Sequence, residues 1–403
     1  MKGRSWLALI VVAVGLLLAA ILGLFTYIST TATPLHPNAQ DVPSVTQSAS
    51  LPKWTGPVEE ARKIVRASLT EQNLPGLSVA VGADGDIVWA EGFGWADLEN
   101  QKKVAPDTRF RIGTASKALT SAAVGLLLEK DRLKLDDEIQ TYVPTFPRKQ
   151  WPVTLRQLMG HLAGVRNDAG DEEDLSTGCE QTIDGLQRFA DSPLRFEPGT
   201  QYKYSNYGWI LVSAAVEAVA GQPFFTFMRK QIFEPLGMVD TRAYSATAPV
   251  GNRALFYFPR FAGDPRYGPQ EPREIDYSCF AGSAAFLSTP SDLARFVMAI
   301  NGGTLLQPAT VQLLQAPQRL ASGQETGYGL GWDLETVAVA GEQKRVAGHD
   351  GELMGGMVTS FWTFPEHGIV VAVTSNTSYA DTWSIALKIA QAFGERGTSP
   401  ARK

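Results

Sequence analysis

The sequence predicts an α/β (α+β) fold: an antiparallel sheet built from both ends of the globular chain, flanked by helices, with a mainly helical lobe inserted between them. β-rich runs at 77–81 and 87–95 flank Asp84-Gly85, a hairpin signal, so the sheet begins antiparallel. Similar runs return at 356–364 and 369–374, and the chain between the two pairs is mainly helical. The ends therefore meet in one sheet, and a cleft between the lobes is the expected place for a site.

The first 28 residues are predicted to be a membrane anchor. Residues 6–27 carry no charge, and at about 1.5 Å per helical residue they span roughly 33 Å, enough for a bilayer core. Lys2 and Arg4 precede them, which favours an uncleaved, single-pass anchor in the cytoplasmic (inner) membrane with the rest of the chain periplasmic. The alternative is a cleaved signal peptide, with the Thr-Thr-Ala run at 30–32 as a mediocre cleavage site.

Three parts are expected beyond the anchor. Residues 29–56 carry four prolines among Ser, Thr, Ala and Gln, which predicts a disordered linker. The globular domain is expected over 57–393, with an amphipathic helix at each end, 57–72 and 380–393. Residues 394–403 are expected to form a short tail.

The composition excludes several classes of protein. With 36 Lys+Arg against 41 Asp+Glu the formal net charge is -5, which disfavours nucleic acid as a partner because phosphate binding needs a concentrated basic surface. Two cysteines and four histidines, none clustered at ligand spacing, argue against a zinc site or a disulfide-built scaffold. We therefore expect side-chain chemistry on a small-molecule or peptide substrate, with no cofactor and no metal.

The first candidate catalytic group opens an Ala/Leu-rich helix expected at 115–130. Thr114 stands three residues before Lys117, at a helix N-terminus whose N–H groups can stabilise an oxyanion. At about 100° per residue, Thr114 and Lys117 lie roughly 60° apart, whereas Ser116 lies about 200° from Thr114. If Lys117 is a base for a nucleophile on this helix, Thr114 is the better placed hydroxyl.

Two further motifs follow much later in the chain. Tyr204-Ser205-Asn206 precedes a helical pattern, and its tyrosine and asparagine are candidates for a proton shuttle and an amide donor. Gly348-His349-Asp350-Gly351 precedes the first of the C-terminal β-rich runs. Each motif alone is typical of a cap, a turn or a structural histidine. The order of the three motifs and the sequence around each of them are together more specific than any one motif.

Taken together, the motifs resemble the class C β-lactamase and penicillin-binding-protein superfamily of serine hydrolases. The resemblance covers about 57–393, and 110–166 looks closest to the mitochondrial serine β-lactamase-like branch and its bacterial relatives. It implies a β-lactamase/transpeptidase-like fold and a covalent acyl-enzyme that water hydrolyses. The other runs that carry it are 110–118, 135–144, 154–164, 234–238 and 288–293.

The resemblance also implies a role for each motif residue. The residues that it assigns to catalysis are Thr114 as nucleophile, with Lys117 and Tyr204 as the pair that moves its proton. Those that it assigns to substrate binding are Asn206, His349, Gly351 and Glu352. It places the oxyanion hole at the backbone N–H groups of Thr114 and Glu352.

Two positions depart from the family's pattern. Thr114 stands where the family has serine, and its extra methyl stiffens χ1 and crowds the acyl-enzyme, so slow turnover is expected. His349-Asp350 stands where β-lactamases carry Lys-Thr, which suits a substrate carboxylate; a mostly neutral histidine beside an aspartate weakens that match. Peptides, esters or amides are therefore expected as substrates at least as much as penicillin.

By resemblance, Cys179 and Cys279 both lie near the mouth of the cleft. A domain outside the membrane is in an oxidising compartment, so one expectation is a Cys179–Cys279 disulfide and the other is two independent buried thiols.

Two hypotheses for function follow. The first is a membrane-anchored acyl hydrolase of the peptidase, esterase or amidase type. The second is a weakly active or inactive family member that serves as a membrane-tethered scaffold or self-assembles as a homo-oligomer. Thr114 motivates the second, together with the resemblance to a branch that includes filament formers.

Overall fold

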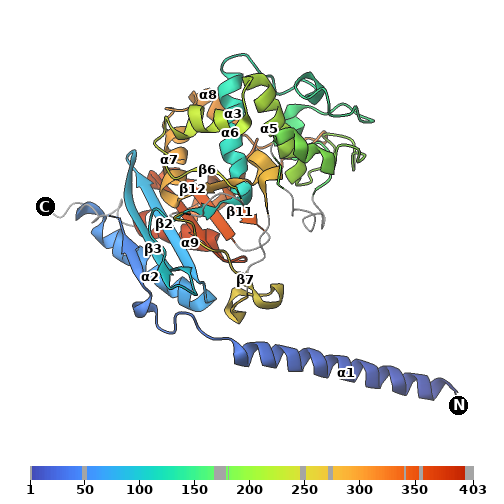
Figure 1. Ribbon diagram of the computed structural model, residues 1–403, viewed down its shortest axis with the longest axis vertical. Coiled ribbons are helices and arrows are strands. Elements are labelled where there is room, and N and C mark those ends of the chain that lie inside the picture. Colours follow the sequence, from blue (N-terminus) through green and yellow to red (C-terminus); the bar gives the residue numbers. More distant parts are fainter. Residues whose placement is uncertain are drawn as a thin grey trace.

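The predicted sheet is present in the computed structural model, which describes residues 2–47, 52–167, 178–179, 181–245, 251–270, 276–339, 342–353 and 357–394. Its strands are β1 (Ser44–Thr46), β2 (Gly76–Ala83), β3 (Asp86–Asp97), β4 (Lys102–Lys103), β10 (Asp333–Val339), β11 (Glu342–Leu353), β12 (Met357–Phe364) and β13 (Ile369–Ser375). Within the described residues they follow the order β1-β3-β2-β13-β12-β11-β10, with β4 paired to β3 (Figure 1).

The two ends of the globular chain meet at the centre of this sheet, as predicted. Strands β2 and β13 pair antiparallel, with Leu77 opposite Ser375. The β2–β3 hairpin turns at Asp84 and Gly85, whose φ angles of 55° and 86° fit the primed turn that suits a twisted pair of strands. Every residue of β2, β12 and β13 is buried, because helices cover both faces of the sheet.

Three helices cover the sheet. Helices α2 (Thr55–Gln72) and α9 (Thr382–Gly394) lie together on one face, and α7 (Pro290–Asn301) lies on the other (Figure 1). Buried apolar residues follow the helical period on α2 and α9, and they form one core with the sheet. The amphipathic helices expected at 57–72 and 380–393 are thus observed within two residues of their expected starts.

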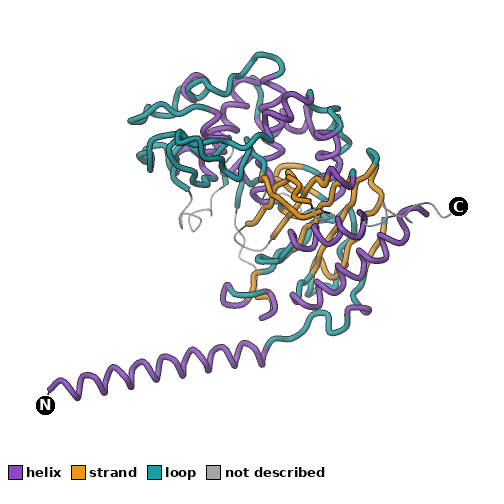
Figure 2. Tube along the Cα trace, turned by 180° about the vertical axis from the view of Figure 1, so that it is seen from behind, coloured by secondary structure: helices purple, strands orange, loops and turns teal. Residues whose placement is uncertain are grey.

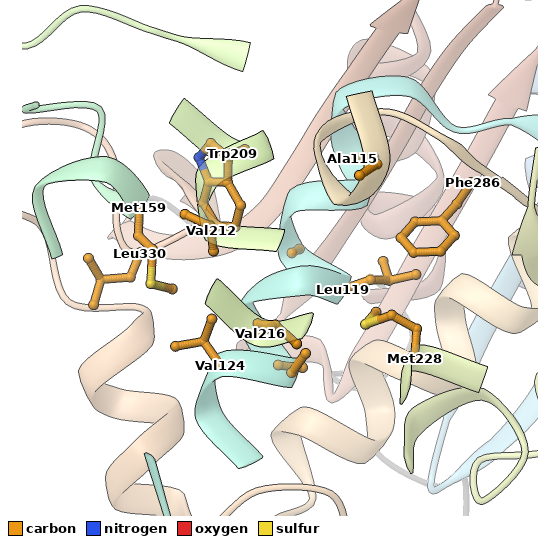
Figure 3. Packing of buried hydrophobic residues seen from close by; sticks show 14 of the residues in the cluster. Ala115, Leu119, Val124, Met159, Trp209, Val212, Val216, Met228, Phe286 and Leu330 are labelled. Atoms are coloured by element: carbon orange, nitrogen blue, oxygen red, sulfur yellow. The ribbon is translucent and has the colours of Figure 1, made fainter. Parts of the chain in front are cut away.

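The inserted lobe packs around a helix that is buried except at Leu126 and Leu128 near its end. Its helices are α3 (Ser116–Leu128), α4 (Leu155–Met159), α5 (Asn206–Ala220), α6 (Phe224–Met228) and α8 (Pro308–Leu314), and a small sheet joins β5 (Phe110–Arg111), β9 (Phe286–Ser288) and β6 (Arg242–Ala243). Figure 3 shows Leu119 and Val124 of α3 among Val212 and Val216 of α5, Met228 of α6 and Phe286 of β9. This packing fixes the start of α3, where Thr114 lies, against the sheet.

The segment between the predicted anchor and the domain differs from the linker expected over 29–56. Helix α1 (Lys2–Thr31) projects away from the body (Figure 2), but β1 pairs with β3 and His36 is buried. Arg66 of α2 donates to the carbonyls of Gln40 and Val42 at 2.9 and 2.8 Å. These backbone contacts bind a polar, proline-rich segment to the body, which its composition does not indicate. The tail expected over 394–403 lies, apart from Gly394, outside the described residues.

Strands β10 and β11 are a second difference, because the sequence predicts β structure at this end only from residue 356. His349, Gly351 and Glu352 lie within β11 and not ahead of a strand. The glycines that resemble turn signals are required for close backbone approach: a Cβ at Gly348 would collide with the carbonyl of Phe361, and one at Gly351 with the carbonyl of Ile112.

Candidate active site

Thr114 lies where a short strand turns into the buried helix. Strand β5 leads into a single 3₁₀ turn, η3 (Gly113–Ala115), which continues as α3. Gly113 has a φ of 55°, and a Cβ there would come within 2.9 Å of the carbonyl of Glu352, so the turn and β11 are in direct backbone contact. The Thr114 hydroxyl donates to the carbonyl of Asp350 at 3.3 Å.

Lys117 is fully buried one turn further along α3. Its exposed fraction is 0%. The ammonium Nζ donates to Oδ1 of Asn206 at 2.7 Å and to the carbonyl of Ser283 at 3.4 Å, and it lies 4.6 Å from the centroid of the Tyr204 ring. Burying an amine is costly unless its hydrogens are bonded, so these contacts place Lys117 in one position.

The residues before α5 hold Tyr204 beside Lys117. Ser205 is the N-cap, and its Oγ accepts from the N–H of Gly208 at 3.1 Å. The Ser205 N–H donates to Nδ1 of His161 at 3.1 Å, and the His161 ring lies 4.1 Å from the Tyr204 ring, centroid to centroid. Burial, with a smaller effect of Lys117, lowers the pKa of His161 well below its ordinary value. A neutral His161 therefore supports Tyr204 without adding charge.

The opposite wall of the site is β11, and His349 is its buried centre. A carbonyl can only accept, so Nδ1 of His349 donates to the carbonyl of Asp350 at 2.5 Å, and Nε2 accepts from the hydroxyl of Tyr328 at 2.9 Å. Burial, reinforced by Lys117, lowers the pKa of His349 to about 3, so the ring is neutral at physiological pH.

Carboxylates gather around this wall. Oδ2 of Asp333 accepts from the N–H of Asp350 at 3.1 Å and lies 3.5 Å from Nδ1 of His349. Burial raises the pKa of Asp333 to about 6, although 30% of its side chain remains exposed. Burial also raises the pKa of Asp350 and Glu352. The wall therefore carries negative charge at neutral pH and readily takes up a proton.

The two walls enclose a cavity of about 490 Å³. It is lined by Thr114, Tyr204, Asp333, His349, Asp350, Gly351, Glu352, Val358, Ser360, Ala380, Asp381, Thr382 and Trp383. Among these described residues there is no lysine or arginine, whereas four are acidic. Such a lining suits a neutral or amine-bearing substrate better than a carboxylate.

Five of the residues selected from the sequence line this cavity: Thr114, Tyr204, His349, Gly351 and Glu352. Lys117 and Asn206 lie behind it and contact each other. Ser116, the neighbouring hydroxyl, is buried and is not part of the lining.

Sequence reasoning missed three residues of this site. Asp333 approaches His349 only because β10 pairs with β11, and both strands were missed. Ser283 contacts Lys117 through its backbone carbonyl, which leaves no signal in the sequence. His161 was part of a recognised run, yet its role beside Tyr204 needs the fold.

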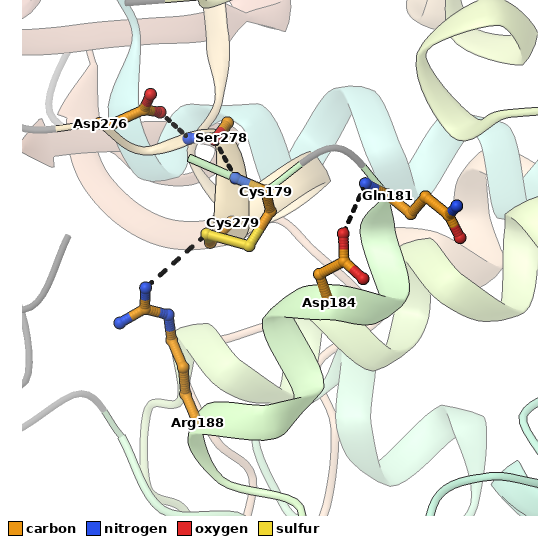
Figure 4. The surroundings of a disulfide bond; sticks show 7 residues. All are labelled: Cys179, Gln181, Asp184, Arg188, Asp276, Ser278 and Cys279. Atoms are coloured by element: carbon orange, nitrogen blue, oxygen red, sulfur yellow. Dashed lines mark hydrogen bonds between the residues drawn. A yellow bond between two sulfur atoms is a disulfide. The ribbon is translucent and has the colours of Figure 1, made fainter. Parts of the chain in front are cut away.

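A disulfide joins Cys179 to Cys279, in the segment whose far end contacts Lys117. The sulfurs of Cys179 and Cys279 are 2.08 Å apart, and the Cys179 N–H donates to Ser278 Oγ at 2.9 Å (Figure 4). Cys279 and Ser278 belong to η10 (Ser278–Ser283), the segment that presents the Ser283 carbonyl to Lys117. Within the described part of the chain, no group of three or more His, Cys, Asp or Glu residues is placed to hold a metal ion.

The sheet is made from both ends of the chain, a helical lobe lies beside it, and a Thr-x-x-Lys helix start lies at their junction. These features define the class as a penicillin-binding-protein-like hydrolase fold. The model of the Beta-lactamase family matches residues 61–392, so the chain belongs to the beta-lactamase family of serine hydrolases.

Known relatives agree with this assignment. The Homo sapiens "Serine beta-lactamase-like protein LACTB, mitochondrial" is 27% identical over 83% of this chain and 79% of that protein. The octameric penicillin-binding protein homologue from Pyrococcus abyssi has a TM-score of 0.67 at 23% identity, covering 82% of this chain and 77% of that one. The D-amino acid amidase from Ochrobactrum anthropi SV3 has a TM-score of 0.68 at 21% identity, covering 85% and 99%. The likeness to the two solved structures shows the fold.

Proposed function

We propose that the chain is a membrane-anchored acyl hydrolase that works through a covalent acyl-enzyme on Thr114. One observation carries the proposal: the cavity-lining hydroxyl of Thr114 lies one helical turn from a fully buried Lys117 that is held against Asn206 and the Tyr204 ring. A buried amine beside a hydroxyl and a phenol is the arrangement that nucleophilic acyl transfer requires.

In the proposed reaction, Thr114 Oγ attacks the carbonyl carbon of the substrate. Its proton passes to neutral Lys117 or to the Tyr204 phenolate, and the oxyanion is held by the N–H groups of Thr114 and Glu352. When the tetrahedral intermediate collapses, the bond to the leaving group breaks and the leaving group takes that proton. Water then attacks the Thr114 ester and passes a proton to the same pair. The bond between the acyl carbon and Thr114 Oγ1 breaks, Oγ1 takes that proton back, and the acid leaves.

The acidic wall supports a substrate without a carboxylate at the position that faces β11. A neutral His349 offers no charge to an anion, and Asp333, Asp350 and Glu352 oppose one. We therefore assign peptides, esters or amides to this site, with a neutral or amine-bearing group on the β11 side.

Helix α1 supports anchoring in the membrane. Its stretch Trp6–Thr31 has 26 residues, and an 18-residue window within it has a mean hydropathy of 3.0 and no buried residue. Helices of this length and composition span bilayers, and a signal sequence near the N-terminus has the same character. We place the catalytic domain outside the cytoplasmic membrane, on the periplasmic side.

Intact-mass spectrometry after treatment with a fluorophosphonate, together with turnover of p-nitrophenyl esters, aminoacyl amides and a chromogenic cephalosporin, tests the assigned nucleophile. The parent is expected to gain one adduct at Thr114, and Thr114→Ala to gain none and to lose turnover by about 10²–10⁴-fold. Thr114→Ser is expected to be at least as fast as the parent, because the crowding methyl is gone. Ser116→Ala is the matched control and should behave as the parent. Equal turnover in Thr114→Ala and the parent would refute the proposed nucleophile.

The scaffold hypothesis remains the second candidate, and Thr114 in place of serine is the observation that favours it. Electron microscopy of the full chain in detergent, with turnover measured on the same sample, separates the two. Filaments or rings without turnover would favour the scaffold, whereas turnover that requires Thr114 favours the hydrolase.

A further inference from the structure

A short excursion from the domain lies against the end of the anchor helix. It runs from β7 (Phe258–Pro259) through two 3₁₀ turns, η8 (Arg260–Ala262) and η9 (Pro265–Tyr267), to β8 (Pro269–Gln270). Strands β7 and β8 pair with each other, and we call the whole segment the 258–270 hairpin. In Figure 1 it lies below the body, on the side from which α1 departs.

Specific contacts hold the 258–270 hairpin to the last turns of α1. Nη2 of Arg260 donates to the carbonyl of Ile28 at 3.3 Å and lies 3.2 Å from the hydroxyl of Thr31. The same guanidinium donates through Nε to the carbonyl of Tyr267 at 2.6 Å. The Tyr267 ring in turn lies edge-on to Phe25 of α1, with centroids 6.3 Å apart.

These contacts set the depth of the hairpin relative to a bilayer. Phe25 lies six residues before Thr31, which is about 9 Å along the helix axis. The apolar stretch of the sequence gives way to serine and threonine at residues 29–31, so Phe25 lies close to the outer boundary of the hydrocarbon core if α1 spans the membrane. The ring of Tyr267 then reaches the same depth.

The surface of the hairpin fits that boundary. Phe261 is 60% exposed although it is a large apolar residue, and its φ of 59° puts it in the left-handed region that bulky side chains avoid. The Arg266 side chain is 65% exposed and paired with Asp264, so the hairpin has little net charge. An aromatic ring beside arginine side chains is typical of segments that lie in the headgroup layer.

We propose that the 258–270 hairpin inserts into the outer headgroup layer of a phospholipid bilayer and so fixes the orientation of the catalytic domain on the membrane. The proposal rests on the membrane anchoring proposed above and not on the chemistry of Thr114. Phe258 links the hairpin to the site: its ring lies 6.1 Å from that of Tyr379, whose N–H donates to Glu352 Oε1 at 3.4 Å. Insertion of the hairpin would therefore hold the β11 wall of the cavity, which carries Glu352, close to the membrane surface.

Site-directed spin labelling of the full chain in phosphatidylcholine vesicles tests this proposal. Labels are attached to Phe261→Cys and, as a second position in the hairpin, Arg266→Cys; non-reducing conditions preserve the Cys179–Cys279 disulfide. The matched control is Val239→Cys, because Val239 is an apolar residue that is 82% exposed and lies on the body. The relative collision rates of each label with oxygen and with a water-soluble nickel chelate report its depth.

We expect the label at 261 about 5–10 Å below the headgroup surface, the label at 266 within the headgroup layer, and the label at 239 in water. A chain that floats with the vesicles while the labels at 261 and 266 are as water-exposed as the one at 239 would overturn the hairpin proposal and leave the anchor intact. A chain that does not float would overturn the anchor and the hairpin proposal together. Ester turnover in the same vesicles reports on Thr114 separately.

Discussion

The two walls of the cavity differ in how they are built and in what they carry. The α3 wall holds Thr114 in the turn before α3 and Lys117 in the first turn of that buried helix, and Lys117 donates hydrogen bonds to Asn206 and Ser283. The β11 wall belongs to strands near the edge of the sheet and carries His349 and Asp333, one neutral and one with a raised pKa. In the proposed reaction, the first wall supplies the groups for acyl transfer, and the second supplies the charges that select the substrate.

The two departures from the family's pattern lie on different walls and differ in kind. On the α3 wall the single departure is Thr114, and it changes a methyl group while keeping the hydroxyl. On the β11 wall, His349-Asp350 in place of Lys-Thr changes the charge of the surface that a substrate meets. Changes to the α3 wall should therefore reduce the rate on every substrate, whereas changes to the β11 wall should alter selectivity and pH dependence.

The largest expected effect is that of Lys117→Met on acylation. Methionine fills a similar volume, but the proposed proton acceptor is lost, so phosphonylation by a fluorophosphonate, which releases fluoride, and turnover of every ester should fall by about 10²–10⁴-fold. The measurement is the rate of adduct formation by intact-mass spectrometry, with circular dichroism to verify folding.

Lys130→Met is the matched control, since Lys130 is exposed just after the same helix. Its rate should equal that of the parent. A Lys117→Met variant that folds and acylates at the parental rate would show that the α3 wall is not the catalytic one.

The disulfide is expected to have the next largest effect, on stability. Cys179 and Cys279 are 100 residues apart in sequence, and removing a native disulfide typically costs about 2–5 kcal/mol. The Cys179→Ser, Cys279→Ser double variant should lose that much free energy of unfolding in urea. Because η10 also carries Ser283, ester turnover should fall more than binding of a substrate analogue weakens. An unchanged unfolding midpoint would contradict this role.

Much of the fold could be predicted from the sequence because local signals agreed with it. The Asp84-Gly85 turn, the apolar face of α2 and the β-rich runs at β12 and β13 each have a periodicity or turn chemistry that tertiary contacts do not override. Strand β11 could not be predicted, since Gly348 and Gly351 look like turn residues and their reason lies in the backbones opposite them. Segment 33–46 likewise packs through contacts that its sequence does not indicate: Arg66 binds its carbonyls, and β1 pairs with β3.

The candidate site divides in the same way. The residues that form the cavity edge could be selected from motif order, because Thr114, Tyr204 and His349 each stand in a recognisable run. Asp333, which contributes to the charge of the β11 wall, could not be selected from the sequence. Its contact with His349 depends on the pairing of β10 with β11, and no fixed spacing in the sequence indicates such a contact.

The smallest expected effect concerns two groups whose proton uptake on folding has opposite sign. Asp333 has a folded pKa of about 6 against an ordinary 3.8, so its stability contribution is present below pH 3.8 and is lost as pH rises through 6. His349 has a folded pKa of about 3 against 6.5, so its contribution is present above pH 6.5 and is lost as pH falls. Between about pH 4 and 6 the two slopes, each up to about 1.4 kcal/mol per pH unit, oppose each other.

Single substitutions should therefore reveal a pH dependence of the free energy of unfolding that is cancelled in the parent. Relative to the parent, His349→Gln should gain stability as pH falls from 6 to 4, because Asp333 still takes up its proton in the folded state, whereas Asp333→Asn should lose stability over the same window. The slope due to Asp333 should be the smaller, since 30% of its side chain is exposed and water screens part of the penalty. Free energies of unfolding in urea at each pH measure both differences, with the exposed Asp107→Asn as a control that should run parallel to the parent. If the curves of unfolding free energy against pH were parallel for all three variants, the β11 wall would lack the two buried groups of opposite pKa shift that distinguish it from the α3 wall.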